Sequence, residues 1–463
     1  MLILWKSVNI PEAEREEKGV RKMKDSSLSS QAEQSMPRLV QFHPALVEPA
    51  TDAQQVEAPQ QSPGAGAGAR GEPAPPAAKS SRLFFLDYLR AFLIILVIML
   101  HLAFTYGPLI NLWYYHDATN ALTAGLVTSL TGIGQAFCLG LFFLISAYFT
   151  PGAYDRKGVG PFLRGRLVRL GLPLLIYDSV INPFVLFIVA GFPGSYWQFY
   201  TGYLLSLRGI GQGPSWFIEA LLFFAMFYAL WRVCSTWWSH ALPGMRTPGR
   251  SITSARRHPY PTTGAILLYI VGLALITFVI RILLPVGWWF QPLNLMLAEF
   301  PQYISMFILG LIAYRRGWLA RIPDAVGKRW CWVALIDLLS FALLYVLNGI
   351  RGGSIDYFLG GFHWQALVYA SWEAIMCVAM CTGLLVFFRK HLNRPGRVWN
   401  FLSANAYATY IFHPVILVGL AYSLHTVALY PLLKLGIAVV IAVPMSFLIS
   451  SMIRKIPFAN RVL

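Results

Sequence analysis

Charged residues are scarce in this 463-residue chain. Asp, Glu, Lys and Arg together make up 12% of it, about half their share in a typical soluble domain. Acidic residues are the scarcer kind, with 20 Asp and Glu against 37 Lys and Arg. Because 57% of the residues are hydrophobic, the composition excludes an ordinary soluble globular protein and indicates a polytopic membrane protein. We interpret the basic excess as loop charge that sets membrane topology, and we expect no nucleic-acid partner.

Cysteine is also scarce, with five residues and no CxxC pair of the zinc-binding type. Cys377 and Cys381 lie one helical turn apart in an apolar stretch, which favours packing over redox chemistry. We therefore expect no metal and no tightly bound cofactor. The chain also has no Asn-x-Ser/Thr sequon, no GxSxG elbow and no HxxxxD motif, so it lacks common markers of glycosylation and of two other enzyme classes.

The first 82 residues differ from the rest of the chain. They hold ten basic and ten acidic residues, and Gln54–Ala78 is rich in Pro, Ala, Gly and Gln without apolar periodicity. Such a segment cannot bury a core. Met1–Trp5 is too short for the core of a signal peptide. We predict a disordered cytoplasmic tail over 1–82 and a membrane domain over 83–463.

Hydrophobic runs after residue 82 predict an all-α membrane protein of about ten spans. The expected spans are 83–105, 127–149, 168–190, 214–233, 263–285, 299–315, 330–348, 365–388, 401–423 and 428–452. With the N-terminus inside, 22 Lys and Arg fall on the inner side and three on the outer side. By the positive-inside rule, both termini are cytoplasmic and the protein lies in the plasma or inner membrane.

The first span carries Asp87, Arg90 and His101, and ionisable groups inside a membrane helix are costly and commonly functional. Eleven helical steps separate Arg90 from His101, so the two share one face within about 20° and lie roughly 16 Å apart. The structural alternative is an Asp87–Arg90 pair at the helix start, or an Arg90 side chain that extends to the interface. No carboxylate lies within one turn of His101.

The expected outer loops, 107–123 and 191–215, are rich in Trp and Tyr. These residues are typical of an interfacial belt. The alternative is a platform on which sugar rings stack, with the glycine-rich segment Gly209–Trp216 as a lid.

Arg90 and His101 of the first span resemble the signature of the acyltransferase-3 family of integral-membrane O-acyltransferases. The first span of that family carries an Arg–x10–His pair. The resemblance covers roughly residues 83–453. Further segments are similar to the family's other motifs in chain order: Phe142–Phe149, Arg166-Leu-Val-Arg169 with the following Leu-Gly-Leu-Pro173, Ser215–Phe217, Met306–Tyr314 and Ala406–Pro414. Ala147 stands where the family usually has Gly, which we interpret as a packing change.

The resemblance implies transfer of an acetyl or succinyl group from cytoplasmic acyl-CoA, as co-substrate, to a hydroxyl of an extracytoplasmic glycan or related acceptor. The segment from Arg166 to Leu175 favours the polysaccharide-succinylating branch. Some relatives carry a C-terminal extracytoplasmic hydrolase-like domain. This chain ends at Leu463, so we expect the membrane domain to act alone or with a separate extracytoplasmic partner.

A base and a cationic donor site would perform this chemistry. Histidine suits proton removal from a hydroxyl, and arginine binds phosphate at any pH. We predict that His101 is the base, or carries the acyl group transiently, and that Arg166 and Arg169 bind the CoA phosphates with Arg90. The alternative for Arg166 and Arg169 is ordinary inner-side charge.

Four further residues are candidates for the acceptor side. His413 is a second base or an acceptor ligand, or else a packing residue, and Tyr410 lies within hydrogen-bonding reach of it along the helix. Trp216 and Glu219 are one turn apart in the fourth span. We expect the other acidic residues in the spans to be mostly structural, pairing with Arg281, Lys434 or Arg90.

Two other functions fit ten spans with buried charges. A transporter of small anions or acylated carbohydrate is the main alternative, although the chain shows no internal repeat. A sensory or scaffold protein whose tail recruits partners is the other. The acyl group, the acceptor and the oligomeric state are not readable from the sequence.

Overall fold

The computed structural model describes residues 83–108, 113–192, 194–206, 213–241, 260–291, 293–350, 352, 354 and 356–462. The predicted tail over 1–82 lies outside these residues. The described part of the chain is built from helices, with a single isolated β-bridge between Phe290 and Leu295 and no strand.

Ten stretches of helix are long and apolar enough to cross a membrane, which confirms the predicted all-α polytopic fold. Seven are single helices: α3 (Phe84–Tyr106), α10 (Ser215–Ala241), α11 (Thr263–Leu283), α13 (Asp324–Ile350), α15 (Trp364–His391), α16 (Arg397–Leu424) and α17 (Pro431–Ile453). Two join neighbouring elements: α4 (Ala121–Tyr148) with α5 (Thr150–Lys157), and η3 (Leu297–Glu299) with α12 (Phe300–Arg316). Three short helices lie between or after the spans: α9 (Tyr196–Ser206), α14 (Asp356–Leu359) and α18 (Ala459–Val462).

The remaining span, Val159–Val189, is a helix interrupted twice by π turns. It consists of α6 (Val159–Arg166), η1 (Leu167–Gly171), α7 (Leu172–Ile176), η2 (Tyr177–Ile181) and α8 (Asn182–Val189). Pro173 and Pro183 lie two residues after the ends of the two π turns. A proline has no N–H and its ring clashes with the carbonyl one turn back. The wider π turns relieve this clash, and they leave backbone carbonyls without a helical donor.

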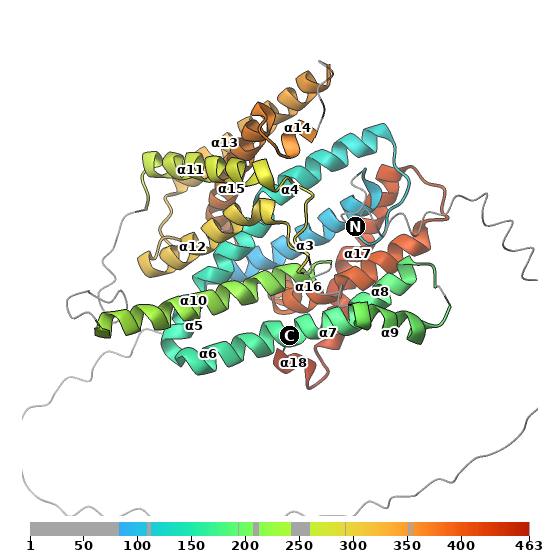
Figure 1. Ribbon diagram of the computed structural model, residues 1–463, viewed down its shortest axis with the longest axis horizontal. Coiled ribbons are helices and arrows are strands. Elements are labelled where there is room, and N and C mark those ends of the chain that lie inside the picture. The colour runs from blue at the N-terminus through green and yellow to red at the C-terminus, as the bar shows by residue number, and fades with distance from the viewer. Residues whose placement is uncertain are drawn as a thin grey trace, which may run out of the picture. The chain divides into compact units, whose positions relative to one another are not determined.

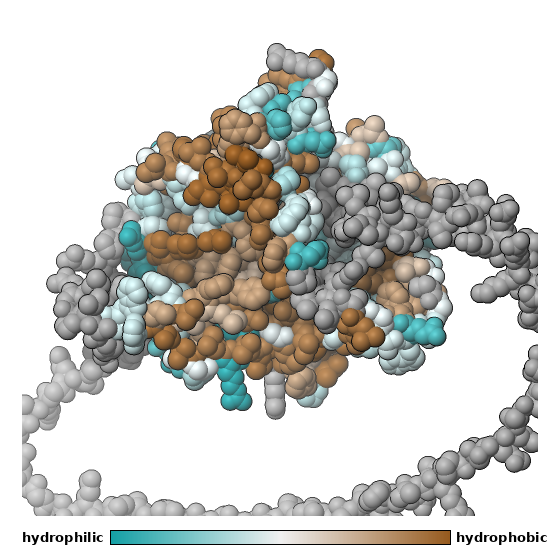
Figure 2. Space-filling model, in the orientation of Figure 1, coloured by the Kyte–Doolittle hydropathy of each residue, from teal (hydrophilic) through white to brown (hydrophobic). Residues whose placement is uncertain are grey.

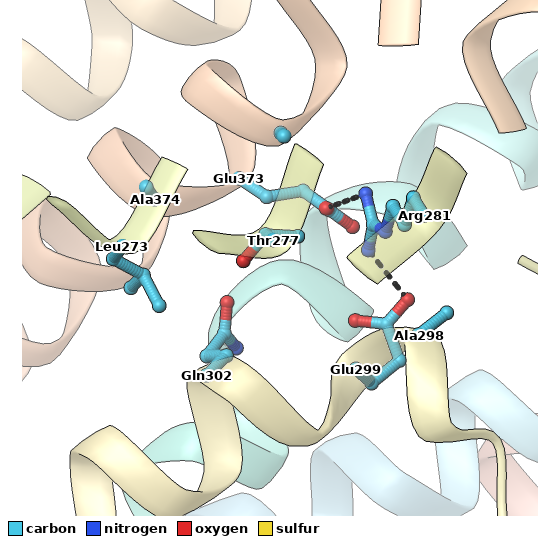
Figure 3. A pocket seen from close by; sticks show the side chains of 9 residues that line it. Leu273, Thr277, Arg281, Ala298, Glu299, Gln302, Glu373 and Ala374 are labelled. Atoms are coloured by element: carbon cyan, nitrogen blue, oxygen red, sulfur yellow. Dashed lines mark hydrogen bonds and ion pairs between the residues drawn. The ribbon is translucent and has the colours of Figure 1, made fainter. Parts of the chain in front are cut away.

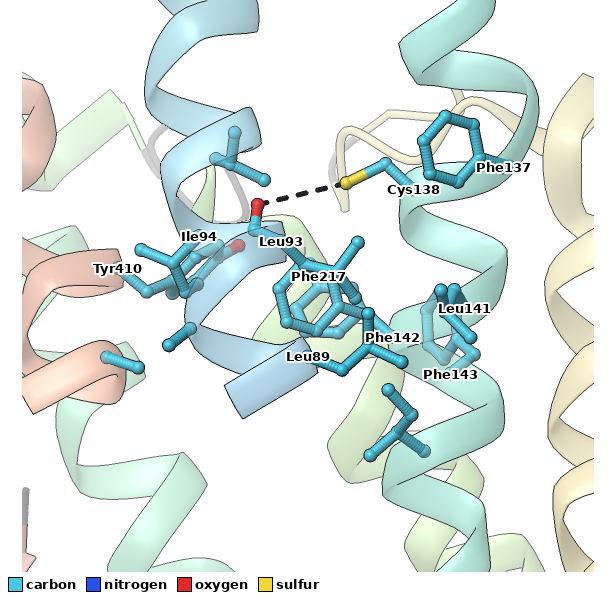
Figure 4. Close-up of a cluster of buried hydrophobic side chains, with 14 of the residues drawn as sticks. Leu89, Leu93, Ile94, Phe137, Cys138, Leu141, Phe142, Phe143, Phe217 and Tyr410 are labelled. Carbon is cyan, nitrogen blue, oxygen red and sulfur yellow. Dashed lines mark hydrogen bonds between the residues drawn. The ribbon is translucent and has the colours of Figure 1, made fainter. Parts of the chain in front are cut away.

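The helix α3 is central to the packing, because it contacts α4, α15, α16 and α17 (Figure 1). A large apolar core surrounds it. In this core, Leu89 and Leu93 of α3 face Phe142 and Phe143 of α4 and Phe217 of α10 (Figure 4). The thiol of Cys138 donates a long hydrogen bond to the Leu93 carbonyl, at 3.9 Å. The first span is thereby held inside the bundle.

The helices α4 and α12 pack closely where Gly310 meets the α4 backbone. A Cβ at Gly310 would lie 2.7 Å from the Cβ of Ala147 and would also overlap the Leu144 carbonyl oxygen. The missing side chain at Gly310 therefore makes room for Ala147, the position where the family usually has Gly.

Large apolar side chains remain exposed over the helix surfaces, as expected for a protein surrounded by lipid. Figure 2 shows broad hydrophobic areas on one face of the molecule. The span α13 is the least buried, and Ile336, Leu339 and Leu343 are more than half exposed on it. We take this helix to be peripheral and lipid-facing.

Candidate active site

His101 and His413 lie together in the interior. His101 is in the second half of α3 and His413 is in the middle of α16. The distance from His101 Nδ1 to His413 Nε2 is 2.8 Å, and the two rings are nearly parallel with centroids 5.0 Å apart. His413 is fully buried, whereas His101 retains partial exposure. The structure thus brings the predicted base into direct contact with one of the candidate acceptor-side residues.

Trp113 covers the imidazole of His101. Its ring stacks on His101 with centroids 3.9 Å apart and an angle of 10° between the planes. Trp113 belongs to the loop between α3 and α4, which the sequence marked only as an aromatic belt or sugar platform. Its indole Nε1 is buried without a hydrogen-bond partner among the described residues. The sequence placed Trp113 among the aromatic loop residues but did not predict its contact with His101.

A buried ion pair fixes the loop that carries Trp113. Lys434 of α17 donates to Asp117 at 2.8 Å, and both side chains are largely buried. The Asp117 N–H also donates to the Thr105 carbonyl at 2.8 Å. Lys434 therefore pairs with a loop residue, where we had expected a carboxylate of the spans.

A chain of hydroxyl and amide groups continues from the same loop. Tyr177 and Tyr114 share a hydrogen bond of 2.8 Å, and Tyr114 donates to Asn182 at 2.5 Å. Asn182 donates to Tyr203 at 2.8 Å, and Tyr203 donates to the Asp178 carbonyl at 2.9 Å. Burial raises the pKa of Tyr114, and it raises the pKa of Tyr203 to about 12. Both hydroxyls therefore stay protonated at neutral pH and act as neutral donors.

Two of the three predicted donor-binding arginines, Arg90 and Arg166, contact the break between α4 and α5. Arg90 pairs with Asp87 and its guanidinium lies 5.4 Å from the ring centroid of Phe149. Arg166 donates a hydrogen bond of 3.1 Å to the hydroxyl of Thr150, which follows Phe149 in the chain. The structural alternative of an Asp87–Arg90 pair is thus realised, and Arg90 still keeps 42% of its side chain exposed.

Arg169 lies in the π turn η1, exposed at the surface. Its carbonyl accepts a hydrogen bond of 2.5 Å from the hydroxyl of Tyr407 on α16. Pro173, four residues later, cannot supply the helical N–H to this carbonyl. Tyr407 replaces that donor. It thereby connects the arginine group, meaning Arg90, Arg166 and Arg169, with the helix that carries His413.

Trp216 and Glu219 lie in the first turns of α10. Trp216 stacks against Tyr303, with centroids 5.8 Å apart. Glu219 is 4% exposed, and its Oε2 has no hydrogen-bond partner among the described residues. Tyr410 connects this helix with the histidine pair, because its hydroxyl donates to the Pro214 carbonyl just before α10 while its ring lies near His413.

A second charged cluster lies in the same bundle (Figure 3). Arg281 of α11 pairs with Glu299 at 2.7 Å and with Glu373 of α15, and its guanidinium lies over the Tyr369 ring. Arg281 is fully buried. The crevice beside these groups has no room for a water molecule. Two of the acidic residues therefore pair with Arg281, as expected.

Two comparisons with known proteins found sequences similar to this chain. The sequence profile of an acyltransferase family, described as "Acyltransferase domain", matches residues 83–451. Glucans biosynthesis protein C of Escherichia coli K12 is 24% identical over 345 residues, which are 74% of this chain and 84% of that protein, and the same protein from two further K12 strains matches equally. No solved structure matches.

Proposed function

Since this chain belongs to the acyltransferase-3 family and is a multi-pass membrane acyltransferase, we propose that it transfers an acetyl or succinyl group from cytoplasmic acyl-CoA to a hydroxyl of an extracytoplasmic glycan. The observation that carries this proposal is the His101–His413 pair beneath Trp113. Arg90 lies on the same helix, roughly 16 Å along its axis from His101 at about 1.5 Å per residue.

The arginine group supports an anionic donor at one end of the bundle. CoA carries phosphates, and guanidinium groups bind phosphate in a planar, two-point geometry. Arg90, Arg166 and Arg169 would hold these phosphates, with the thioester directed along α3 toward His101. The positive-inside distribution supports a cytoplasmic location for this end and for both termini.

His101 would act as the general base. Its ring removes the proton of the acceptor hydroxyl as the oxygen attacks the thioester carbonyl carbon. A C–O bond forms, the C–S bond breaks, and the protonated His101 returns its proton to the departing CoA thiolate. The reaction therefore needs no metal or redox partner for its balance.

The acceptor proposal rests on the relatives and on the aromatic loop. Glucans biosynthesis protein C is named for glucans, and the aromatic side chains of the loop that carries Trp113 and Tyr114 are suited to stacking on sugar rings. Trp216 and Glu219 would contact the acceptor farther along α10.

The decisive experiment compares ester formation by wild type, His101→Ala and the control His425→Ala, which changes an exposed histidine at the end of α16. Base-labile esters on envelope glycans are measured by mass spectrometry at matched protein levels. We expect His101→Ala to lower the rate about 10²- to 10⁴-fold, the usual contribution of a general base, and His425→Ala to have no effect. Label carried across the membrane without ester formation would instead indicate a transporter.

Donor binding is tested separately. We expect the double variant Arg166→Ala/Arg169→Ala to weaken binding of acyl-CoA to the purified protein, while Arg321→Ala, which removes an exposed arginine after α12, leaves it unchanged. Calorimetry in detergent measures both. Equal affinity in the double variant and in wild type would remove these arginines from the donor site.

A further inference from the structure

The helical environment of His413 contains an unusual carbonyl. Pro414, the next residue, lies inside α16 and has no N–H. In a regular helix the N–H of residue 414 would donate to the carbonyl of residue 410. The Tyr410 carbonyl is therefore left without its helical donor, and His413 Nδ1 lies 2.7 Å from it.

This contact fixes where the proton of His413 lies. A carbonyl oxygen only accepts hydrogen bonds, so Nδ1 of His413 must carry the hydrogen. In the neutral ring, Nε2 of His413 then has a lone pair and is an acceptor.

The same reasoning extends to His101. Its Nδ1 lies 2.8 Å from the acceptor Nε2 of His413, so Nδ1 of His101 is the donor and carries the hydrogen. Nε2 of His101 is then the unprotonated nitrogen, and no group in the described part of the chain is hydrogen-bonded to it. Backbone carbonyl, His413 and His101 thus form one directed chain of hydrogen bonds.

We propose that His413 is a positioning residue, whose tautomer is set by the carbonyl that Pro414 leaves free, and that it presents Nε2 of His101 as the base. This inference rests on the proposed acyl transfer. It reassigns His413, because both of its ring nitrogens are occupied and its side chain is fully buried, which leaves it no group for an acceptor ligand.

The arrangement also stabilises the charge that forms on His101. When Nε2 takes the proton, the bond from Nδ1 to His413 becomes charge-assisted and stronger. The indole of Trp113, stacked 3.9 Å away, adds a cation–π contact. A neutral imidazole and an aromatic face thus take the place that a carboxylate holds in the serine hydrolases.

The tautomers can be measured without turnover. In protein labelled with ¹⁵N-histidine and assigned with His101→Ala and His413→Ala, we expect both rings to carry hydrogen on Nδ1 and not on Nε2. Hydrogen on Nε2 of His101 would overturn the proposal even if the protein is an acyltransferase. The expected spectrum together with no transferase activity would instead reject the function and leave the hydrogen-bond chain intact.

Two substitutions at position 413 test positioning through activity. The amide oxygen of His413→Gln can accept from Nδ1 of His101, whereas His413→Leu cannot. Loss of the partner that orients a metal-bound histidine commonly lowers activity about 10- to 100-fold. By analogy we expect a decrease of that size in kcat for Leu, a smaller one for Gln, and an unchanged KM for acyl-CoA and acceptor. Equal kcat for Gln and Leu, or a raised acceptor KM, would contradict the positioning role.

The role of the proline is tested with a matched pair. Pro414→Ala restores an N–H that competes for the Tyr410 carbonyl, whereas Pro444→Ala makes the same change inside α17. We expect Pro414→Ala to mix the His413 tautomers and to lower kcat less than His413→Leu does, with no effect of Pro444→Ala. Unchanged ¹⁵N signals in Pro414→Ala would remove the proline from the argument.

Discussion

Arg281 is a charged residue in the interior whose charge is compensated by neighbouring carboxylates. Arg281 is fully buried and meets two carboxylates, Glu299 and Glu373. Burying such ions is expensive, and removing one partner costs more than the pair contributes, because the remaining charge stays uncompensated. We therefore expect the cluster to determine which helices pack together more than it adds to the net stability of the protein.

Removing one charge of this cluster should therefore affect stability more than removing all of its charges. Arg281→Met should destabilise the protein by about 3–5 kcal/mol, because it leaves two buried carboxylates without a cation. The triple variant Arg281→Met/Glu299→Gln/Glu373→Gln, which is neutral, should recover most of the loss. Thermal unfolding in detergent checks both, and a triple variant as unstable as the single one would show that shape, not charge, holds the three helices.

At the scale of helices, the contact of α4 with α12 depends on one missing side chain. A methyl group at Gly310 would overlap the Leu144 carbonyl and the Ala147 side chain. We expect Gly310→Ala to cost about 1–3 kcal/mol, typical of overpacking. Adding Ala147→Gly should restore only part of this, because the Leu144 backbone remains in place.

Gly272 of α11 provides the control, because nothing lies within 4 Å of a Cβ at that position. Gly272→Ala should be neutral or slightly stabilising, since alanine is the better helix former. Melting temperatures of the two alanine variants in the same detergent make the comparison. An equal loss in both would mean that helix propensity, and not the α4–α12 contact, determines the effect.

For the whole molecule, the topology proposal is testable with cysteines. In a background without the five native cysteines, we expect Ala118→Cys, in the α3–α4 loop, to react in intact cells with a membrane-impermeant thiol reagent. Pro395→Cys, between α15 and α16, should react only after the membrane is opened. Both positions are exposed. The reverse pattern would invert the protein and place the arginine group outside.

The sequence predicted the ten spans because the length of a hydrophobic run is enough to identify each one. The observed ends of the spans differ from the predicted ends because local interactions determine where a helix begins and stops. The second span begins at Ala121, six residues earlier than expected, because the Asn120 side chain caps it by accepting from the Thr123 N–H. The family motifs also directed attention to His101 and His413 as separate candidates.

The contacts between distant segments were beyond what the sequence could predict. The partnership of His101 with His413 and the stacking of Trp113 depend on how α3, α16 and the loop pack, and no periodic pattern encodes this. Pro173 and Pro414 were visible in the sequence. The side chains that supply the missing hydrogen-bond donors, Tyr407 and His413, follow only from the packed structure.

The contact between the two histidines has a consequence for the protein's synthesis. They are separated by 312 residues, so a ribosome adding roughly 5–20 residues per second needs about 15–60 s between them. Until the ninth span has been inserted, the nascent chain presents His101 without its partner. A truncated product, however well inserted, would lack the hydrogen bond that orients His101 in the complete protein.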